Sequence, residues 1–87
     1  MKKMKSKLAQ ALALPKEVVL DMTVVQATGR NEVLIENYKS LVEFSETKIR
    51  VRARGFFIAL EGQNLALLQV TAENLLIGGA IDSVLYS

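Results

Sequence analysis

Cysteine, histidine and tryptophan are all absent from this chain of 87 residues, which also contains only one proline. Without cysteine there is no disulfide bond and no thiolate metal ligand. Without histidine the chain lacks the usual general base, so its serines have no partner of the kind that activates a nucleophile. No clustered-carboxylate loop of the calcium-binding type occurs either. We therefore expect no enzyme activity, no bound metal and no cofactor.

Long apolar runs are also missing. Every uninterrupted run is far shorter than the roughly 20 residues that a membrane-spanning helix needs. Gln10 interrupts the apolar stretch that follows the first lysines, which argues against a cleaved secretory signal. These features favour a cytoplasmic protein. Even so, 51% of the residues are apolar, which argues against disorder and favours an apolar surface that a partner covers.

Charge is distributed unevenly along the chain. Residues 1–16 contain five lysines and no acidic residue, whereas residues 17–87 contain six cations and nine anions. The basic tail has two interpretations: it lies against an anionic membrane surface or nucleic acid, or it only keeps the terminus soluble. The candidate membrane-proximal residues are Lys2, Lys3, Lys5 and Lys7.

The first segment has the composition of a short helix. Apolar residues recur at helical spacing over residues 4–14, and Pro15 disfavours any continuation of the helix. We therefore divide the chain into a basic N-terminal helix or tail, residues 1–14, and a single β domain, residues 15–87.

The remainder of the chain has the pattern of strands. β-Branched and aromatic residues occur in short runs separated by Gly, Asn, Ser and charged residues. Such short connections predict a mainly β fold, a small antiparallel meander of hairpins, because parallel crossovers need a dozen or more residues. A sandwich and a barrel-like sheet both remain open. The predicted strands are residues 18–21, 24–28, 32–37, 40–45, 48–54, 56–61, 65–70 and 75–86.

The clearest local signal lies between Lys48 and Glu61. Apolar and charged residues alternate strictly over residues 48–54, which predicts a strand with one buried face. A tight turn at Arg54 and Gly55 would then place six apolar residues on one side of a hairpin. The alternative is one long bent strand with a bulge at Gly55. The predicted pairs are Ala53–Phe56, Arg52–Phe57, Val51–Ile58, Arg50–Ala59, Ile49–Leu60 and Lys48–Glu61.

Two other glycine-containing segments carry predictions. Gly62-Gln63-Asn64 predicts a second turn, which would separate two strands. The Gly78-Gly79 doublet predicts a bulge or a close backbone approach within the last strand. A phosphate-binding loop is the less favoured interpretation of this doublet, because no nucleotide-binding motif surrounds it.

The charged face of the strand at residues 48–54 is the best candidate binding surface. It carries four cations, and an aromatic residue across the hairpin could stack on a nucleic-acid base. The alternative is an ordinary solvated sheet face, whose cations discourage edge-to-edge aggregation. Nucleic acid is the less favoured partner, because no RNA-binding or cold-shock signature accompanies the cations. The candidate residues are Lys48, Arg50, Arg52, Arg54 and Phe57.

Several short segments occur in an order and at a spacing that resemble a known family. They are Leu14-Pro-Lys-Glu-Val-Val-Leu-Asp21, Ile35-Glu-Asn-Tyr-Lys39, Val42-Glu-Phe44, Ile49-Arg-Val51, Gly55, Ile58, Leu60-Glu-Gly62, Leu65 and Ile81-Asp-Ser-Val-Leu-Tyr86. Together they resemble the YabP/YqfC family of sporulation proteins and are most similar to its YqfC-type branch. The resemblance implies no catalytic residue. It implies that Asn37 and Gly55 are turn residues.

The resemblance also implies a role. Members of this family are similar in being small non-enzymatic factors of endospore formation, made in the mother cell beside a membrane protein of the YqfD or YabQ type. This implies a structural, protein-binding factor in the mother-cell cytoplasm, peripheral to the membrane around the forespore. The apolar excess adds the expectation of a homo-oligomer. The alternative is a small basic β-module that binds nucleic acid or anionic lipid.

Overall fold

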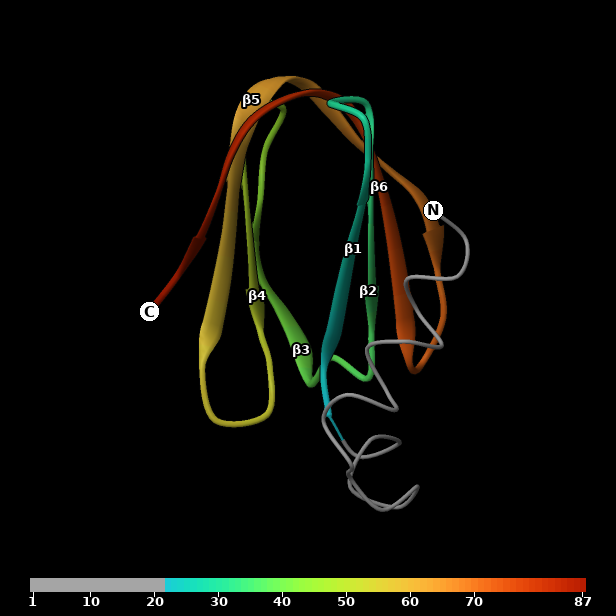
Figure 1. Ribbon diagram of the computed structural model, residues 1–87, viewed down its shortest axis with the longest axis vertical. Coiled ribbons are helices and arrows are strands. Elements are labelled where there is room, and N and C mark those ends of the chain that lie inside the picture. Colours follow the sequence, from blue (N-terminus) through green and yellow to red (C-terminus); the bar gives the residue numbers. More distant parts are fainter. Residues whose placement is uncertain (1–21) are drawn as a thin grey trace, which may run out of the picture.

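Six strands run through residues 22–87, the part of the chain that the computed structural model describes (Figure 1). All neighbouring strands are antiparallel, so the predicted mainly β class is confirmed. The predicted N-terminal helix and the predicted strand at residues 18–21 lie outside the described residues. The strands are β1 (Val24–Thr28), β2 (Glu32–Glu36), β3 (Ser40–Phe44), β4 (Lys48–Arg52), β5 (Phe57–Val70) and β6 (Asn74–Tyr86).

The strand order in the sheet is β1-β2-β6-β5-β4-β3. The strands β3 to β6 follow one another as neighbouring hairpins, as the predicted meander requires. The prediction is wrong for β2, which pairs with β6 instead of β3. The physical reason is the shared core: the β2–β6 ladder sets Val33 opposite Ile77, and both side chains are buried.

The two longest strands, β5 and β6, bend near their middles, and the sheet folds over on itself (Figure 1). The backbones of β5 and β6 approach each other closely at this bend. A Cβ atom on Gly62 would overlap the carbonyl oxygen of Ala80. A Cβ atom on Gly79, where φ is +131°, would lie 2.6 Å from the carbonyl oxygen of Asn64. Only glycine fits such approaches, so the predicted close backbone contact at Gly78-Gly79 is confirmed.

The predicted turn at Gly62-Gln63-Asn64 is wrong. This segment belongs to the continuous strand β5, where Gln63 pairs with Ala80 across a register shift. Asn64 has a φ of 54°, a left-handed conformation that asparagine tolerates better than most residues. Glycine and asparagine favour both bulges and turns, because both residues tolerate a positive φ. Here pairing with β6 makes the segment a bulged part of a strand and not a turn.

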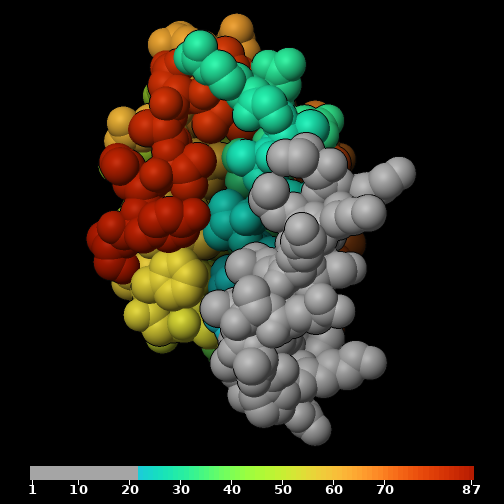
Figure 2. All heavy atoms as spheres, viewed as in Figure 1, coloured from blue at the N-terminus to red at the C-terminus, as the bar shows by residue number. Residues whose placement is uncertain are grey.

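The hairpin of β4 and β5 has the predicted register, from Lys48 opposite Glu61 to Arg52 opposite Phe57. The turn closes with the N–H of Ala53 donating to the carbonyl oxygen of Phe56 at 2.8 Å. The alternative of a bulge at Gly55 is therefore wrong. Gly55 has a φ of 94° and Arg54 has no positive φ, so the turn is not of type I′. Figure 2 shows this turn (yellow) beside the carboxyl-terminal end of β6 (red).

One core lies between the two layers of the folded sheet. The first layer contains β1, β2 and the adjoining halves of β6 and β5, and the second contains β4, β3 and the other halves (Figure 1). Both outermost strands, β1 and β3, are left as edges, so the sheet is open rather than a closed barrel. The buried core residues are Val33, Ile35, Ile49, Val51, Ala53, Ile58, Leu60, Leu65, Leu75, Ile77 and Ile81.

Candidate functional site

The predicted cationic face is the outer surface of β4. The inward residues of this strand, Ile49 and Val51, are completely buried in the core. Because side chains alternate along a strand, Lys48, Arg50 and Arg52 project outward. Lys48 and Arg50 are half-buried among neighbouring side chains, whereas Arg52 is exposed. The alternation of apolar and charged residues in the sequence therefore predicted correctly that Lys48, Arg50 and Arg52 share the outer face of β4.

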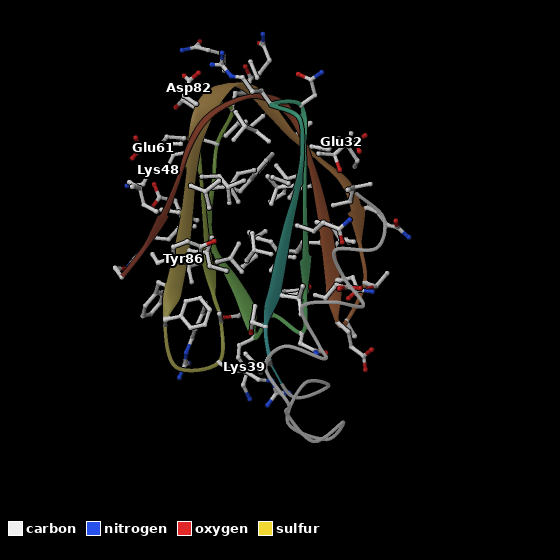
Figure 3. All side chains as sticks on the ribbon, in the orientation of Figure 1. Glu32, Lys39, Lys48, Glu61, Asp82 and Tyr86 are labelled. Atoms are coloured by element: carbon white, nitrogen blue, oxygen red, sulfur yellow. The ribbon has the colours of Figure 1, made fainter. Side chains whose placement is uncertain are left out.

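Acidic residues flank the cations on both sides. Lys48 lies directly opposite Glu61 of β5, as predicted, and the two side chains project from the same surface in Figure 3. Arg50 lies opposite Glu43 of β3, a neighbour that the hairpin pattern alone does not reveal. Two carboxylates thus stand among three strand cations. This arrangement produces a weaker positive field than four lone cations would.

Phe57 is opposite Arg52, as predicted, but its ring is in contact with a different residue. The guanidinium carbon of Arg50 lies 4.5 Å from the centroid of the Phe57 ring. This is a cation–π geometry, and it occupies one face of the ring. The half-buried ring is therefore part of the packing of the sheet surface, and less of it is available for stacking on a base than the sequence predicts.

The fourth predicted cation, Arg54, lies in the β4–β5 turn and not on the strand face. Its backbone N–H donates to the side-chain hydroxyl of Thr23 at 3.2 Å, which ties the turn to the residues just before β1. Asn37 has a φ of 62° in the connection between β2 and β3, so the turn roles implied for Asn37 and Gly55 are both confirmed. The tail candidates Lys2, Lys3, Lys5 and Lys7 lie outside the described residues.

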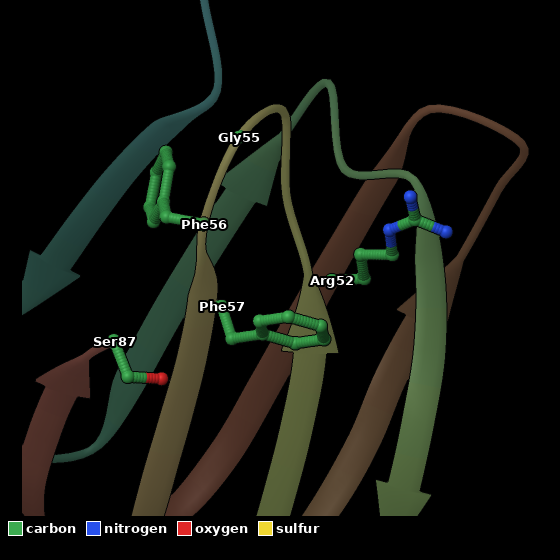
Figure 4. A pocket seen from close by; sticks show the side chains of 5 residues that line it. All are labelled: Arg52, Gly55, Phe56, Phe57 and Ser87. Atoms are coloured by element: carbon green, nitrogen blue, oxygen red, sulfur yellow. The ribbon is translucent and has the colours of Figure 1, made fainter.

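An open hollow of about 430 Å³ lies beside the turn (Figure 4). It forms because the end of the chain returns to β5: the N–H of Phe57 donates to the Ser87 carbonyl oxygen at 2.9 Å, and the N–H of Ser87 donates back at 3.0 Å. Arg52 and the Phe57 ring lie on one side of β5 in Figure 4, whereas the Phe56 ring lies on the other side, so the lining groups do not converge on one point. The sequence did not reveal this hollow, because Ser87 reaches it only through the pairing of β6. The lining residues are Arg52, Gly55, Phe56, Phe57 and Ser87.

A second surface feature is apolar. Five of the large apolar side chains that the described part of the chain exposes lie on only two strands, β3 and the second half of β5. The high apolar fraction of the chain predicted an exposed apolar surface but not the strands on which it lies. These five residues, which we name the apolar edge patch, are Leu41, Val42, Phe44, Leu68 and Val70.

Two other classes of site were sought within residues 22–87. No group of three or more carboxylates lies close enough together in this region to hold a metal ion. In the same region, no helix has the length and apolar character needed to cross a membrane.

Comparison with known proteins shows the family to which this chain belongs. The YabP family matches residues 20–87, which include all six strands and both surface features. This chain belongs to the YabP family. It is also 32% identical over 84 residues to YqfC of Bacillus subtilis (strain 168), a match that covers 97% of this chain and 90% of that protein. No solved structure matches it. The resemblance drawn from the short segments is thereby confirmed.

Proposed function

We propose that this protein is a non-enzymatic assembly factor of endospore formation. The observation that carries the proposal is membership of the YabP family along the whole folded sheet. The resemblance noted in the sequence connects this family with sporulation. The surface of the described region supports a binding role, because its main features are an apolar patch and an open hollow rather than a nucleophile with an activating base.

The finer part of the proposal concerns place and partner. The protein acts in the mother cell, at the cytoplasmic surface of the membrane around the forespore, with a membrane protein of the YqfD or YabQ type. Support comes from the family resemblance and from the basic residues that precede the sheet in the sequence. Lysines contribute about 1 kcal/mol each to association with an anionic membrane surface, so such a tail would hold the protein near its partner.

Deletion of the gene in its own host tests the role. We expect vegetative growth to be unchanged and the number of heat-resistant spores to fall, with recovery when the wild-type gene is restored. Complementation by an Arg50→Glu, Arg52→Glu variant serves as a control for the cationic face, and we expect it to restore spores. Normal spore numbers in the deletion strain would contradict the proposed role.

Co-purification tests the partner. A tagged copy of the chain, extracted from sporulating cells in mild detergent, should retain the multi-spanning membrane protein encoded beside its gene. A variant with Lys2, Lys3, Lys5 and Lys7 changed to glutamine separates the tail from the sheet. If the wild-type chain retains no membrane protein, the proposed partnership is wrong even if the sporulation defect is found.

The alternative function, binding of nucleic acid or anionic lipid by a basic β-module, depends on Arg52 and Arg54. Both are exposed, whereas Lys48 and Arg50 face carboxylates. Four phosphate contacts would give a slope of about −3.6 for log K against log salt. We expect weak binding with a shallower slope, because few cations are free of acidic neighbours. A slope near that value, abolished by Arg52→Glu with Arg54→Glu, would support the alternative instead.

A further inference from the structure

The two layers of the sheet are built from equivalent strands. Each layer contains one short hairpin, β1–β2 in the first and β3–β4 in the second, beside halves of the two long strands. At the bend, the N–H of Gly79 donates to the carbonyl oxygen of Asn31 at 3.1 Å. In the equivalent place, the N–H of Gly62 donates to the carbonyl oxygen of Thr47 at 3.1 Å. Because Asn31 directly precedes β2 and Thr47 directly precedes β4, these two strands occupy equivalent places in the two layers.

The outer face of the first layer has an apolar centre. Leu34 of β2 lies opposite Leu76 of β6, and both project outward because the residues beside them in sequence are buried in the core. Leu68 of β5 extends this centre: a Cβ atom on Gly78 would lie 2.6 Å from its side chain, which therefore covers the outer side of β6. The charged residues of β2, at the two ends of the strand, are both glutamates. We name this surface the first outer face, and its residues are Glu32, Leu34, Glu36, Leu68 and Leu76.

The outer face of the second layer is mainly cationic. Its β4 residues are the three strand cations described above, and Glu43 and Glu61 lie beside them, so three positive and two negative charges leave one net positive charge. The centre of this face is also apolar, because Ala59 lies between Arg50 and Leu85 in one row across the strands. The Leu85 side chain is 52% exposed. We name this surface the second outer face, and it is formed by Lys48, Arg50, Arg52, Phe57, Ala59 and Leu85.

The two outer faces carry opposite charges at equivalent positions. Figure 3 shows Glu32 and Lys48 projecting from opposite sides of the molecule. The two glutamates begin and end β2, as Lys48 and Arg52 begin and end β4, so each pair spans about 13 Å along its strand. None of these four side chains forms an ion pair within residues 22–87. The glutamates of one face and the cations of the other therefore have matching spacing and are available to a partner.

Contact between unlike faces of two copies matches these charges. When β2 of one copy lies antiparallel over β4 of another, Glu32 meets Arg52 of the other copy. Glu36 then meets Lys48, and the apolar centres of the two faces also meet, in the aligned packing that sheets adopt in β-sandwiches. Two first outer faces would instead oppose glutamates, and two second outer faces would oppose cations. The charges therefore select a second copy in one orientation.

We propose that copies of this chain stack on one another, with the first outer face of each copy on the second outer face of the next. Such a heterologous contact repeats without closing, so it produces open stacks rather than a symmetric dimer. Each face is four strands wide and about five residues long, roughly 19 by 16 Å, which is at the low end for a specific interface. Association is therefore weak and depends on salt. This inference rests on the sheet alone and is independent of the proposed sporulation role.

Sedimentation of the purified full-length chain over a wide range of protein concentrations tests the proposal. At about 0.01 M salt, we expect the average mass to rise with concentration past that of a dimer. At about 1 M salt, where charges more than about 3 Å apart are screened, it should return toward the monomer mass. A chain that stays monomeric at high concentration in low salt overturns the proposal. So does a mass that levels off at two chains, because this result indicates a closed dimer.

Charge reversal tests which faces meet. Glu32→Lys with Glu36→Lys makes both outer faces cationic. Lys48→Glu with Arg52→Glu makes both outer faces acidic. Each double variant alone should associate about tenfold or more weakly than the wild-type chain, and an equimolar mixture should associate again, because the cationic faces of one variant then meet the acidic faces of the other. A contact between two like faces would instead be changed by only one of the two reversals.

A matched control separates contact between the faces from net charge. Glu46→Lys with Glu73→Lys makes the same change in net charge as reversal of the first outer face, but both residues are exposed and lie in turns outside the two faces. This control should associate as the wild-type chain does, and circular dichroism should show the same β spectrum for all variants. Equal weakening by the control overturns the proposal, as does a mixture that fails to recover. If only reversal of the first outer face weakens association, that face binds another part of the chain instead.

Discussion

Gly62→Ala tests whether close backbone contact at the bend sets the shape of this sheet. The added Cβ atom would overlap the carbonyl oxygen of Ala80, which is part of the β6 backbone and cannot rotate away. To accommodate it, β5 and β6 must separate locally and lose adjacent ladder hydrogen bonds. Gly29→Ala is the matched control: its φ is +57°, but nothing lies within 4 Å of the added atom.

The two substitutions separate two physical effects. Gly29→Ala tests conformation alone, and the left-handed backbone costs about 1 kcal/mol for a residue with a side chain. Gly62→Ala tests the steric effect alone: overpacking costs about 1–3 kcal/mol, and each lost hydrogen bond about 1 kcal/mol more. We therefore expect about 3 kcal/mol or more for Gly62→Ala. A chain of 87 residues has a total stability of roughly 4–13 kcal/mol, so this is a large fraction.

Urea unfolding followed by circular dichroism measures the difference. With an m-value of about 1 kcal/mol/M for so small a domain, the midpoint should fall by about 1 M for Gly29→Ala and by about 3 M for Gly62→Ala. All variants are compared at one low protein concentration, because association adds apparent stability. If Gly62→Ala loses no more than Gly29→Ala, backbone contact does not explain why glycine is required at the bend.

Three further substitutions test the core and the surface, each by the same urea titration. Ile58→Ala removes a fully buried side chain and should cost about 2–5 kcal/mol; a loss below about 1 kcal/mol would mean that the layers do not pack as described. Phe57→Leu should cost about 0.5–1 kcal/mol through the lost cation–π contact with Arg50, and combining it with Arg50→Ala should add little if that contact is the cause. Arg30→Ala breaks an ion pair with Asp82 whose side chains are 80% and 54% exposed, so we expect a change of less than about 0.5 kcal/mol. A larger change would show that this pair also holds the β1–β2 turn against β6.

The β4–β5 hairpin could be predicted from the sequence because its information is local. Alternation over residues 48–54 fixes which face of the strand is buried, and a slip of one residue would expose Ile49 and Val51. The turn at Gly55 follows from the same pattern. The pairing of Lys48 with Glu61 therefore needed no knowledge of the remaining strands.

The bend at Gly62 and the pairing of β2 with β6 could not be predicted in the same way. Local signals at Gly62-Gln63-Asn64 are equally typical of a turn and of a bulged strand, and the choice depends on Ala80, which is distant in sequence. Glu43 was missed as a neighbour of Arg50 because it comes from another hairpin. The apolar composition predicted an exposed apolar surface, but its position on β3 and β5 could not be predicted, because the complete strand order decides which strands form edges.

The strand order also affects the order in which the sheet forms. Every ladder except one joins consecutive strands, and the exception is the ladder from Glu32–Gly78 to Glu36–Asn74. Pairing of such distant residues must first overcome loop-closure entropy, which local hairpins largely avoid. We therefore expect the β1–β2 hairpin to join a β3–β6 unit that is already formed. In pulse-labelled hydrogen exchange, amides of β2 that pair with β6 should gain protection after those shared by β4 and β5. The β2–β6 ladder is thus the step that completes the core.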